Sequence, residues 1–284
     1  MTPLELLLEP LGYAFFVRAM LATVVVGLVC AVVGSYMVLR GLAFMGDALS
    51  HSAFPGVVAA YLLQGPFYLG AAVAAVGTAL GIGWLTRTGR LRGDTAIGVL
   101  FAGMFALGIF LFSQIPNYVG DLFGFLFGEV LGISDGDLLA ICILGVLVLA
   151  TVAVLWKELL YSTFDPLGAA AAGLPVVRLD YLFLALFAMT IVVSLQAVGI
   201  ILVVAMLVTP AATGQLVATS FARLVIVAIA VGTIAPILGL FISYWLDAAA
   251  GATVVLVETA VFLIVLIAVR TAARTRKRTL AMHG

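Results

Sequence analysis

Uninterrupted apolar runs of about 20 residues recur along the whole chain, and they constrain its fold more than any other feature. A helix of about 20 apolar residues spans the ~30 Å hydrocarbon core of a bilayer. Only 9% of the 284 residues are charged, whereas a soluble domain carries about 25%. So few charges cannot coat a water-soluble protein of this length, which excludes a soluble enzyme, a nucleic-acid-binding domain and a disordered chain. The runs are also too continuous for the strands of a membrane β-barrel, so the sequence predicts an all-α membrane bundle.

The apolar runs define eight hydrophobic segments, one of which is too long to be a single helix. We expect these segments near 13–38, 46–64, 67–86, 94–114, 136–157, 179–216, 223–246 and 252–270. As one helix, 179–216 would be about 57 Å long at 1.5 Å per residue, which exceeds the thickness of a bilayer. A break near Gln196–Gly199 would divide it into two spans. The sequence therefore predicts about nine transmembrane helices, with eight as the lower count.

Basic residues indicate which loops face the cytoplasm, because the cytoplasmic loops of membrane proteins are enriched in Lys and Arg. Nine spans with the amino terminus outside place twelve of the thirteen basic residues inside and leave only Arg18 toward the outside. Residues 1–284 are then a single membrane domain with a short basic cytoplasmic tail over about 271–284. We expect a multi-pass protein of the plasma (inner) membrane, surrounded by lipid, with its amino terminus outside and its carboxyl terminus in the cytoplasm.

The stretch 40–56 contains the most informative polar residues. Asp47 and His51 are four residues apart and therefore share one helix face, and Pro55 loosens the next turn because it lacks an N–H. Ionisable residues at bilayer depth usually face a polar path, and a carboxylate with an imidazole suits Mn²⁺, Zn²⁺ or Fe²⁺. Two ligands are few, so the pattern suits a transit site or one completed by a second copy of the chain. The structural alternative is that Asp47 caps its helix and His51 binds a neighbouring backbone carbonyl.

A second feature is a short capped helix between the fifth and sixth spans. Its residues are Asp165 at the N-cap, Pro166 at the first helical position, Leu167 and Gly168 after it, and Gly173 at the C-terminal stop. Such a helix would lie off the membrane on the cytoplasmic side. It is either a simple connector or a docking surface for a cytosolic partner.

Three acidic residues are candidates for an outer gate or for the path: Asp121 and Glu129 in an outside segment, and Glu258 in the last span. Glu258 either faces a cavity or lies near the outer interface. The chain has no GxxxxGK[ST] phosphate-binding motif and only two lysines, Lys157 and Lys277. It is therefore expected not to be an enzyme, so another subunit or an ion gradient must supply energy for any transport.

Several of these stretches together resemble the permease subunits of zinc, manganese and iron ABC importers. The matching stretches are 40–56, 126–134, 165–173 and 198–213, and the likeness extends over roughly 13–270. The resemblance implies an architecture similar to that of the larger vitamin B12 and siderophore importers. It implies that two permease subunits, here expected as a homodimer, form the path, that 165–173 docks on a cytosolic ATPase, and that an extracytoplasmic binding protein delivers the metal. Asp47 and His51 correspond to the metal-contacting pair of the family.

The expected function is therefore that of the membrane permease of an ATP-driven importer of a divalent metal ion, Mn²⁺ or Zn²⁺, with Fe²⁺ as a further candidate. The ion is cargo, and neither a permanently bound cofactor nor a nucleic-acid partner is expected. An importer of a metal chelate, such as a siderophore or cobalamin, would have a wide apolar path and tolerate the loss of His51. A secondary transporter would not need the 165–173 helix. A membrane scaffold would explain the composition but not the ionisable pair.

Overall fold

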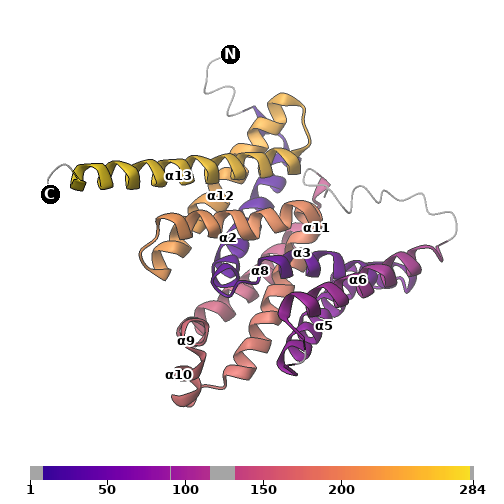
Figure 1. The fold of residues 1–284 in the computed structure, drawn as a ribbon. Helices are drawn as coiled ribbons and strands as arrows, with labels where there is room; N and C mark the ends of the chain where they lie inside the picture. The colour runs from indigo at the N-terminus through magenta and orange to yellow at the C-terminus, as the bar shows by residue number, and fades with distance from the viewer. Residues whose placement is uncertain (1–8, 90, 116–131, 282–284) are drawn as a thin grey trace.

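The computed structural model of the protein describes residues 9–89, 91–115 and 132–281, and it is a bundle of helices (Figure 1). No strand occurs within these ranges. The elements in chain order are η1 (Pro10–Gly12), α2 (Ala14–Leu39), α3 (Ala43–Ser52), α4 (Phe54–Leu62), α5 (Phe67–Arg87), α6 (Gly93–Phe112), α8 (Asp135–Val154), α9 (Trp156–Phe164), α10 (Pro166–Ala171), α11 (Val176–Val217), α12 (Phe221–Leu246) and α13 (Ala250–Ala281).

Eight helical segments of the described chain are long and apolar enough to cross a membrane. They are Ala14–Leu39, Phe67–Arg87, Gly93–Phe112, Asp135–Val154, Val176–Leu195, Ala197–Val217, Phe221–Leu246 and Ala250–Ala272. The expected all-α architecture with eight to nine membrane helices is thereby confirmed. The remaining predicted span, 46–64, is occupied by the pair α3 and α4. The last helix continues past its apolar part to Ala281, over most of the region expected as a basic tail.

The long helix α11 breaks where the sequence predicts. Gly199 has φ 74° and ψ 171°, a non-helical backbone conformation inside the 42-residue element. This region is open almost exclusively to glycine, because a Cβ would clash there. The break lies near the boundary between the two candidate spans Val176–Leu195 and Ala197–Val217, and the axis of α11 changes direction in Figure 1. One apolar run of the sequence thus supplies two spans.

The segment expected over 46–64 differs from a continuous helix. α3 ends at Ser52 and α4 begins at Phe54, so that Ala53 joins two helices of 10 and 9 residues. Neither helix alone is long enough to cross a membrane. The physical reason is Pro55, which occupies the first turn of α4 and has no N–H to donate to the preceding turn. The loosened turn therefore lies beside Pro55, as the sequence predicts.

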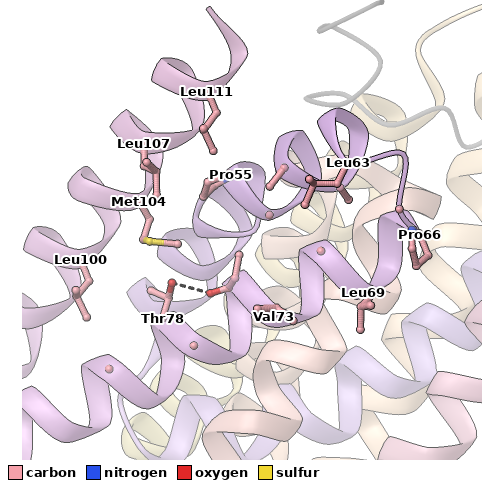
Figure 2. A pocket seen from close by; sticks show the side chains of 18 residues that line it. Pro55, Leu63, Pro66, Leu69, Val73, Thr78, Leu100, Met104, Leu107 and Leu111 are labelled. Carbon is pink, nitrogen blue, oxygen red and sulfur yellow. Dashed lines mark hydrogen bonds between the residues drawn. The ribbon is translucent and has the colours of Figure 1, made fainter. Parts of the chain in front are cut away.

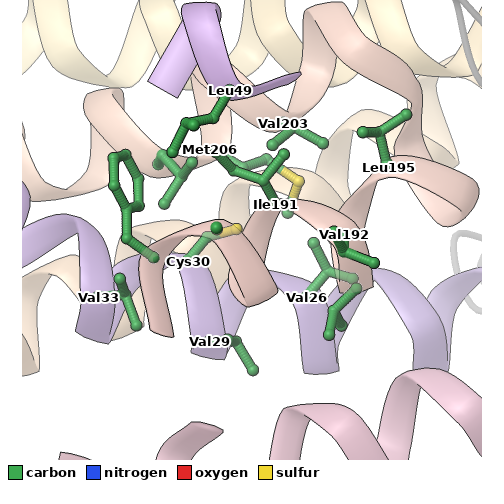
Figure 3. Packing of buried hydrophobic residues seen from close by; sticks show 14 of the residues in the cluster. Val26, Val29, Cys30, Val33, Leu49, Ile191, Val192, Leu195, Val203 and Met206 are labelled. Carbon is green, nitrogen blue, oxygen red and sulfur yellow. The ribbon is translucent and has the colours of Figure 1, made fainter. Parts of the chain in front are cut away.

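The helix α2 forms the centre of the bundle and packs against α8, α11 and α12. Its buried side chains include Val26, Cys30 and Val33, which join Ile191 and Met206 of α11 in one apolar cluster (Figure 3). The Cys30 Sγ atom also lies 3.4 Å from Ser194 Oγ of α11. The core of the molecule is therefore an aliphatic contact between the first membrane helix and both halves of the broken one.

Two glycines allow neighbouring backbones to approach α2 closely. A Cβ atom at Gly27 would collide with the carbonyl oxygen of Gly232 in α12, and one at Gly34 would collide with that of Leu207 in α11. In both cases the obstacle is backbone, which cannot rotate away as a side chain can. Small residues at such crossings are typical of helix packing in membranes, where close van der Waals contact drives association.

We predict that Gly34→Ala lowers the stability of the protein, because the added methyl group overpacks the contact with α11. Overpacking of this kind costs about 1–3 kcal/mol. Gly77→Ala in α5 is the matched control, since a Cβ there meets no atom within 4 Å. Thermal unfolding of the purified protein in detergent, followed by loss of the monodisperse species, measures the difference. Equal midpoints for the two variants would contradict the close approach.

Candidate functional site

The helix α3 places Asp47 and His51 on one face, as their spacing predicts. His51 Nε2 lies 3.6 Å from Asp47 Oδ1, which is longer than a hydrogen bond. The Asp47 side chain is 57% exposed and the His51 side chain 23%. α3 begins at Ala43 with Leu42 as its N-cap, so Asp47 does not cap the helix. His51 Nδ1 is buried and finds no hydrogen-bond partner in the described part of the chain. Asp47 is therefore not the cap of α3, and His51 Nδ1 makes no bond to a backbone carbonyl among the described residues.

Two aromatic rings of α6 fix the orientation of the His51 imidazole. The ring centroids of Phe101 and Phe105 lie 5.4 Å and 5.3 Å from that of His51, in edge-on arrangements of 61° and 78°. Edge-to-face contacts between aromatic rings are favourable and orient both partners. The imidazole is thereby held with Nε2 toward Asp47, so that one carboxylate and one ring nitrogen point to a common region.

A cavity of about 420 Å³ opens beside Asp47, between α3 and α6. Its lining comprises Phe44, Asp47, Ala48, Asp94, Ile97, Gly98 and Phe101. Asp94 lies in the first turn of α6, so two carboxylates from different helices face one space. Asp94 was not predicted from the sequence, because an acidic residue at a helix start after a basic loop is ordinary. Only the packing of α6 on α3 brings it near Asp47. No cluster of three or more His, Cys, Asp or Glu ligands occurs among the described residues.

A second cavity, of about 670 Å³, lies among α4, α5 and α6 and is shown in Figure 2. The labelled side chains that line it are Pro55, Leu63, Pro66, Leu69, Val73, Thr78, Leu100, Met104, Leu107 and Leu111. None of its lining residues is charged, and the Thr78 hydroxyl already donates to the Ala74 carbonyl at 2.8 Å. This cavity offers no ligand set to a bare ion, whereas its walls suit a larger apolar molecule.

The capped helix expected over 165–173 is present as α10. The Gly168 N–H donates to Asp165 Oδ1 at 2.8 Å, which makes Asp165 the N-cap, and Pro166 opens the helix. After the helix, Gly173 has a φ of +86°, and the Leu174 N–H returns to the Ala169 carbonyl at 3.0 Å. The α9 and α10 helices lie at the bottom of the view in Figure 1.

The apolar side chain of Leu167, in the first turn of α10, is 83% exposed. Leu167 is thus accessible to a partner chain, although a single exposed leucine does not by itself indicate an interface. The docking role of α10 stays a prediction.

Charged residues gather at the same end of the bundle. Asp180, near the start of α11, accepts from Arg40 Nη1 at 3.1 Å and from Arg87 Nη2 at 2.5 Å, which ties the ends of α2 and α5 to α11. Burial lowers the pKa of the Arg40 guanidinium, and the charge of Asp180 opposes that shift. At the other end of α2, Arg18 lies 3.1 Å from Asp135 of α8. Arg40 and Arg87, expected on one side of the membrane, thus meet at one carboxylate.

The three acidic candidates for an outer gate have different outcomes. Asp121 and Glu129 lie outside the described residues. Glu258 of α13 is fully buried, and neither of its carboxyl oxygens has a hydrogen-bond partner within the described ranges. It lines neither of the two cavities above. A role of Glu258 in the path stays a prediction.

Eight helical segments that are long and apolar enough to cross a membrane define a polytopic membrane protein. The chain matches the ABC 3 transport family over residues 12–269 and belongs to that family. It is 43% identical over 252 residues to the manganese transport system membrane protein MntC of Listeria monocytogenes, covering 89% of this chain and 90% of that protein. It is 42% identical over 260 residues to the chelated iron transport system membrane protein YfeC of Yersinia pestis, covering 92% and 88%.

A solved structure agrees with these relatives. PsaBC from Streptococcus pneumoniae, in complex with Fab, aligns with a TM-score of 0.83 and 37% identity, covering 92% of this chain and 94% of that one. Family membership makes the chain the multi-pass membrane subunit of an ABC transporter and not an enzyme. The resemblance drawn from 40–56, 126–134, 165–173 and 198–213 is thereby confirmed.

We predict that Asp165→Ala loosens α10, whereas Asp165→Asn leaves it intact. Loss of an N-cap costs about 1 kcal/mol, and asparagine caps as well as aspartate. Hydrogen–deuterium exchange of the Gly168 amide should therefore accelerate roughly fivefold in the alanine variant only. Exchange that is unchanged in the alanine variant would show that packing, not the cap, holds this helix.

Proposed function

We propose that this chain is the membrane permease of an ATP-driven importer of a divalent transition metal ion, with Mn²⁺ as cargo, and that Asp47 and His51 line the ion's path. The observation that carries the proposal is the geometry of α3: an exposed carboxylate 3.6 Å from an oriented imidazole, beside a cavity that holds a second carboxylate. Oxygen and imidazole nitrogen ligands suit Mn²⁺. The relatives named for manganese and for iron favour Mn²⁺ over Zn²⁺ as the first choice.

A second copy of the chain completes this path. One chain offers one carboxylate and one imidazole on α3, fewer than the four to six ligands that divalent ions usually take. A homodimer that brings two α3 helices together supplies two of each. The 57% exposure of the Asp47 side chain in a single chain is consistent with this arrangement, because the carboxylate is open to a facing copy. Incomplete coordination by each chain suits an ion that must also leave.

The remaining partners follow from the two ends of the molecule. A cytosolic ATPase docks on α10, where Leu167 is exposed, and drives the dimer between outward- and inward-facing states. An extracytoplasmic metal-binding protein delivers the ion to the opposite end, and lipid surrounds the apolar helices. This orientation places the amino terminus outside and the carboxyl terminus in the cytoplasm, in keeping with the distribution of basic residues.

The central test is Mn²⁺ uptake into proteoliposomes that contain the chain, its ATPase and its binding protein. We expect Asp47→Asn and His51→Ala each to lower ATP-dependent uptake by about 10- to 100-fold, since even outer-shell partners of a metal contribute that much to affinity. Asp135→Asn, which removes an exposed acid at the start of α8, is the control and should leave uptake unchanged. Full uptake by both α3 variants would refute the assignment of the pair.

We further predict a smaller effect of Asp94→Asn, because this carboxylate raises the local concentration of cations in the cavity without holding the ion alone. Uptake at limiting Mn²⁺ should fall roughly two- to fivefold, the usual range for an exposed charge. Asp94 and Asp135 both lie in the first turn of a 20-residue helix, so Asp135→Asn controls for the loss of an acid at a helix start. If Asp94→Asn and Asp135→Asn took up Mn²⁺ equally well, Asp94 would have no role in the path.

A chelated metal is the second candidate cargo. The apolar cavity of about 670 Å³ and the relative named for chelated iron favour it. The same proteoliposomes distinguish the two cargoes when they are offered free Mn²⁺ or a ferric chelate. Transport of the chelate that survives His51→Ala would favour this second function over the first.

A further inference from the structure

The side chain of Arg40 connects three helices at the end of the molecule that carries α10. Its Nε donates to Thr163 Oγ1 at 3.0 Å and its Nη2 donates to Ser162 Oγ at 3.2 Å, both in the last turn of α9. Its Nη1 donates to Asp180 Oδ1 of α11 at 3.1 Å. The guanidinium also lies 4.3 Å from the ring centroid of Phe183. Every nitrogen of the guanidinium therefore has a partner on α9 or α11, although Arg40 itself follows α2.

The geometry of this contact requires an arginine. A guanidinium offers donors in a fixed planar fork, whereas an ammonium is a point charge on a flexible stem. The Arg40 side chain is only 12% exposed, so its ion pair is screened less by water and salt than a surface pair. A shift of α9 relative to α11 must therefore move Arg40 or break these bonds.

One side of this contact adjoins the predicted ATPase-docking helix. Thr163 is followed by Phe164, by the N-cap Asp165 and then by α10. The Ser162 and Thr163 hydroxyls also donate to the Leu159 carbonyl, at 3.1 Å and 2.6 Å, which fixes both oxygens on α9. A force on α10 thus reaches the partners of Arg40 within one helical turn.

The other side adjoins the helix that carries Asp47. Arg40 is the C-cap of α2, and Gly41 follows with a φ of +68°. The Gly41 N–H donates to the Val38 carbonyl at 3.1 Å and the Leu42 N–H to the Met37 carbonyl at 3.0 Å. This pair of bonds is a Schellman motif, which fixes the turn between the two helices. Since α3 begins at Ala43, a displacement of Arg40 is passed on to α3 by a short and fully hydrogen-bonded connection.

Arg87, at the end of α5, also binds the Asp180 carboxylate. It ends α5 and donates to the second carboxylate oxygen of Asp180, and its guanidinium lies 5.4 Å from the ring centroid of Tyr181. α5 in turn packs against α3 and α4. The carboxylate of Asp180 therefore joins the helix before α3 and a helix that packs on α3.

We propose that Arg40 is a positioning residue that couples the docking segment α9–α10 to α3, so that movement of the ATPase changes the position of the Asp47–His51 pair. This inference rests on the proposed function, because it takes α10 as the docking helix and α3 as the ion-binding helix. The competing explanation is a purely structural ion pair. A structural pair affects folding and assembly, whereas a coupling contact changes how many ions move for each ATP hydrolysed.

The decisive measurement is the ratio of Mn²⁺ taken up to ATP hydrolysed, determined in the same proteoliposomes with the complete complex. We expect Arg40→Gln to keep assembly with the ATPase and to keep ATP hydrolysis, and to lower the ratio at least about fivefold, the lower end of usual allosteric couplings. Arg18→Gln is the matched control, since it breaks an ion pair of equal length at the opposite end of α2. Its ratio should equal that of the wild type.

Two further variants keep the proposal open to refutation. Asp180→Asn should also lower the ratio, because it removes the partner on α11 that Arg40 and Arg87 share. The effects of Asp180→Asn and Arg40→Gln should be less than additive in the double variant, because the Arg40–Asp180 bond is lost in both. Arg40→Lys retains the charge but not the fork, so it should give an intermediate ratio, and it replaces Arg40→Gln if that variant fails to assemble. The proposal would be overturned if Arg40→Gln, or the assembled Arg40→Lys, kept the ratio of the wild type. It would also be overturned if both variants lost assembly, uptake and hydrolysis in parallel.

A readout that does not depend on the cargo separates this inference from the proposed function. Binding of a non-hydrolysable ATP analogue should change hydrogen–deuterium exchange over 43–52 in the wild type and in Arg18→Gln, but not in Arg40→Gln. If the wild type shows this change yet transports no Mn²⁺, the cargo is wrong and the coupling stands. If Arg40→Gln shows the same change as the wild type, the coupling fails whatever the cargo.

Discussion

The close packing of α2 is the contact on which the rest of the bundle depends. In a bilayer the surrounding lipid is as apolar as leucine, so helices associate through close van der Waals fit rather than through expulsion of water. Gly27 and Gly34 provide that fit by admitting the backbones of α12 and α11. Two residues after Gly34, the fully buried ring of Tyr36 lies 4.7 Å from Phe221 and 5.7 Å from Trp156, measured between ring centroids. α2 therefore fixes α9, α11 and α12 against one another, and the ionisable residues are placed relative to this frame.

The candidate path lies where regular helix gives way. Every backbone N–H and C=O in hydrocarbon needs a partner, so membrane helices are interrupted only where protein or a water-lined space can compensate. The described chain has such interruptions at Ala53 beside Pro55, at Leu155 between α8 and α9, and at Gly199. The interruption at Ala53 lies two residues after His51, whose ring contacts Phe101 and Phe105 of α6. Because α3 ends at Ser52, it can tilt without moving a helix that crosses the whole membrane. Such a helix suits a segment that binds and releases an ion.

The sequence predicts those features of the fold that depend on neighbouring residues. The apolar runs predict the spans, the excessive length of 179–216 predicts the break at Gly199, and Asp165, Pro166 and Gly173 predict α10 together with its caps. The spacing of Asp47 and His51 predicts their shared face in the same way. Contacts between distant segments are different. Nothing near Asp94 in the sequence indicates that its cavity also contains Asp47, because only the packing of α6 on α3 determines it.

The same limit applies to Asp180. Its two arginine partners are far away in sequence, and a lone acid at the start of an apolar run would equally suit a helix N-terminus. The pattern of basic residues does predict that Arg40 and Arg87 lie on one side of the membrane, but not that one carboxylate joins them. The basic residues thus predict that these two helix ends lie together, whereas their shared partner depends on the three-dimensional packing of α2, α5 and α11.

The two ends of α2 are held with different firmness, and this difference bears on how the molecule moves. The Arg18–Asp135 pair has its carboxylate 86% exposed, so water and salt screen it and it resists little displacement. The Asp180 carboxylate is 31% exposed, receives two guanidiniums and is connected through Arg40 to two hydroxyls of α9. Polar side chains therefore join the ends of α2, α5 and α9 and the start of α11 at the end that carries α10. A push on the docking helix is then converted into a displacement of α3 rather than absorbed by local loosening.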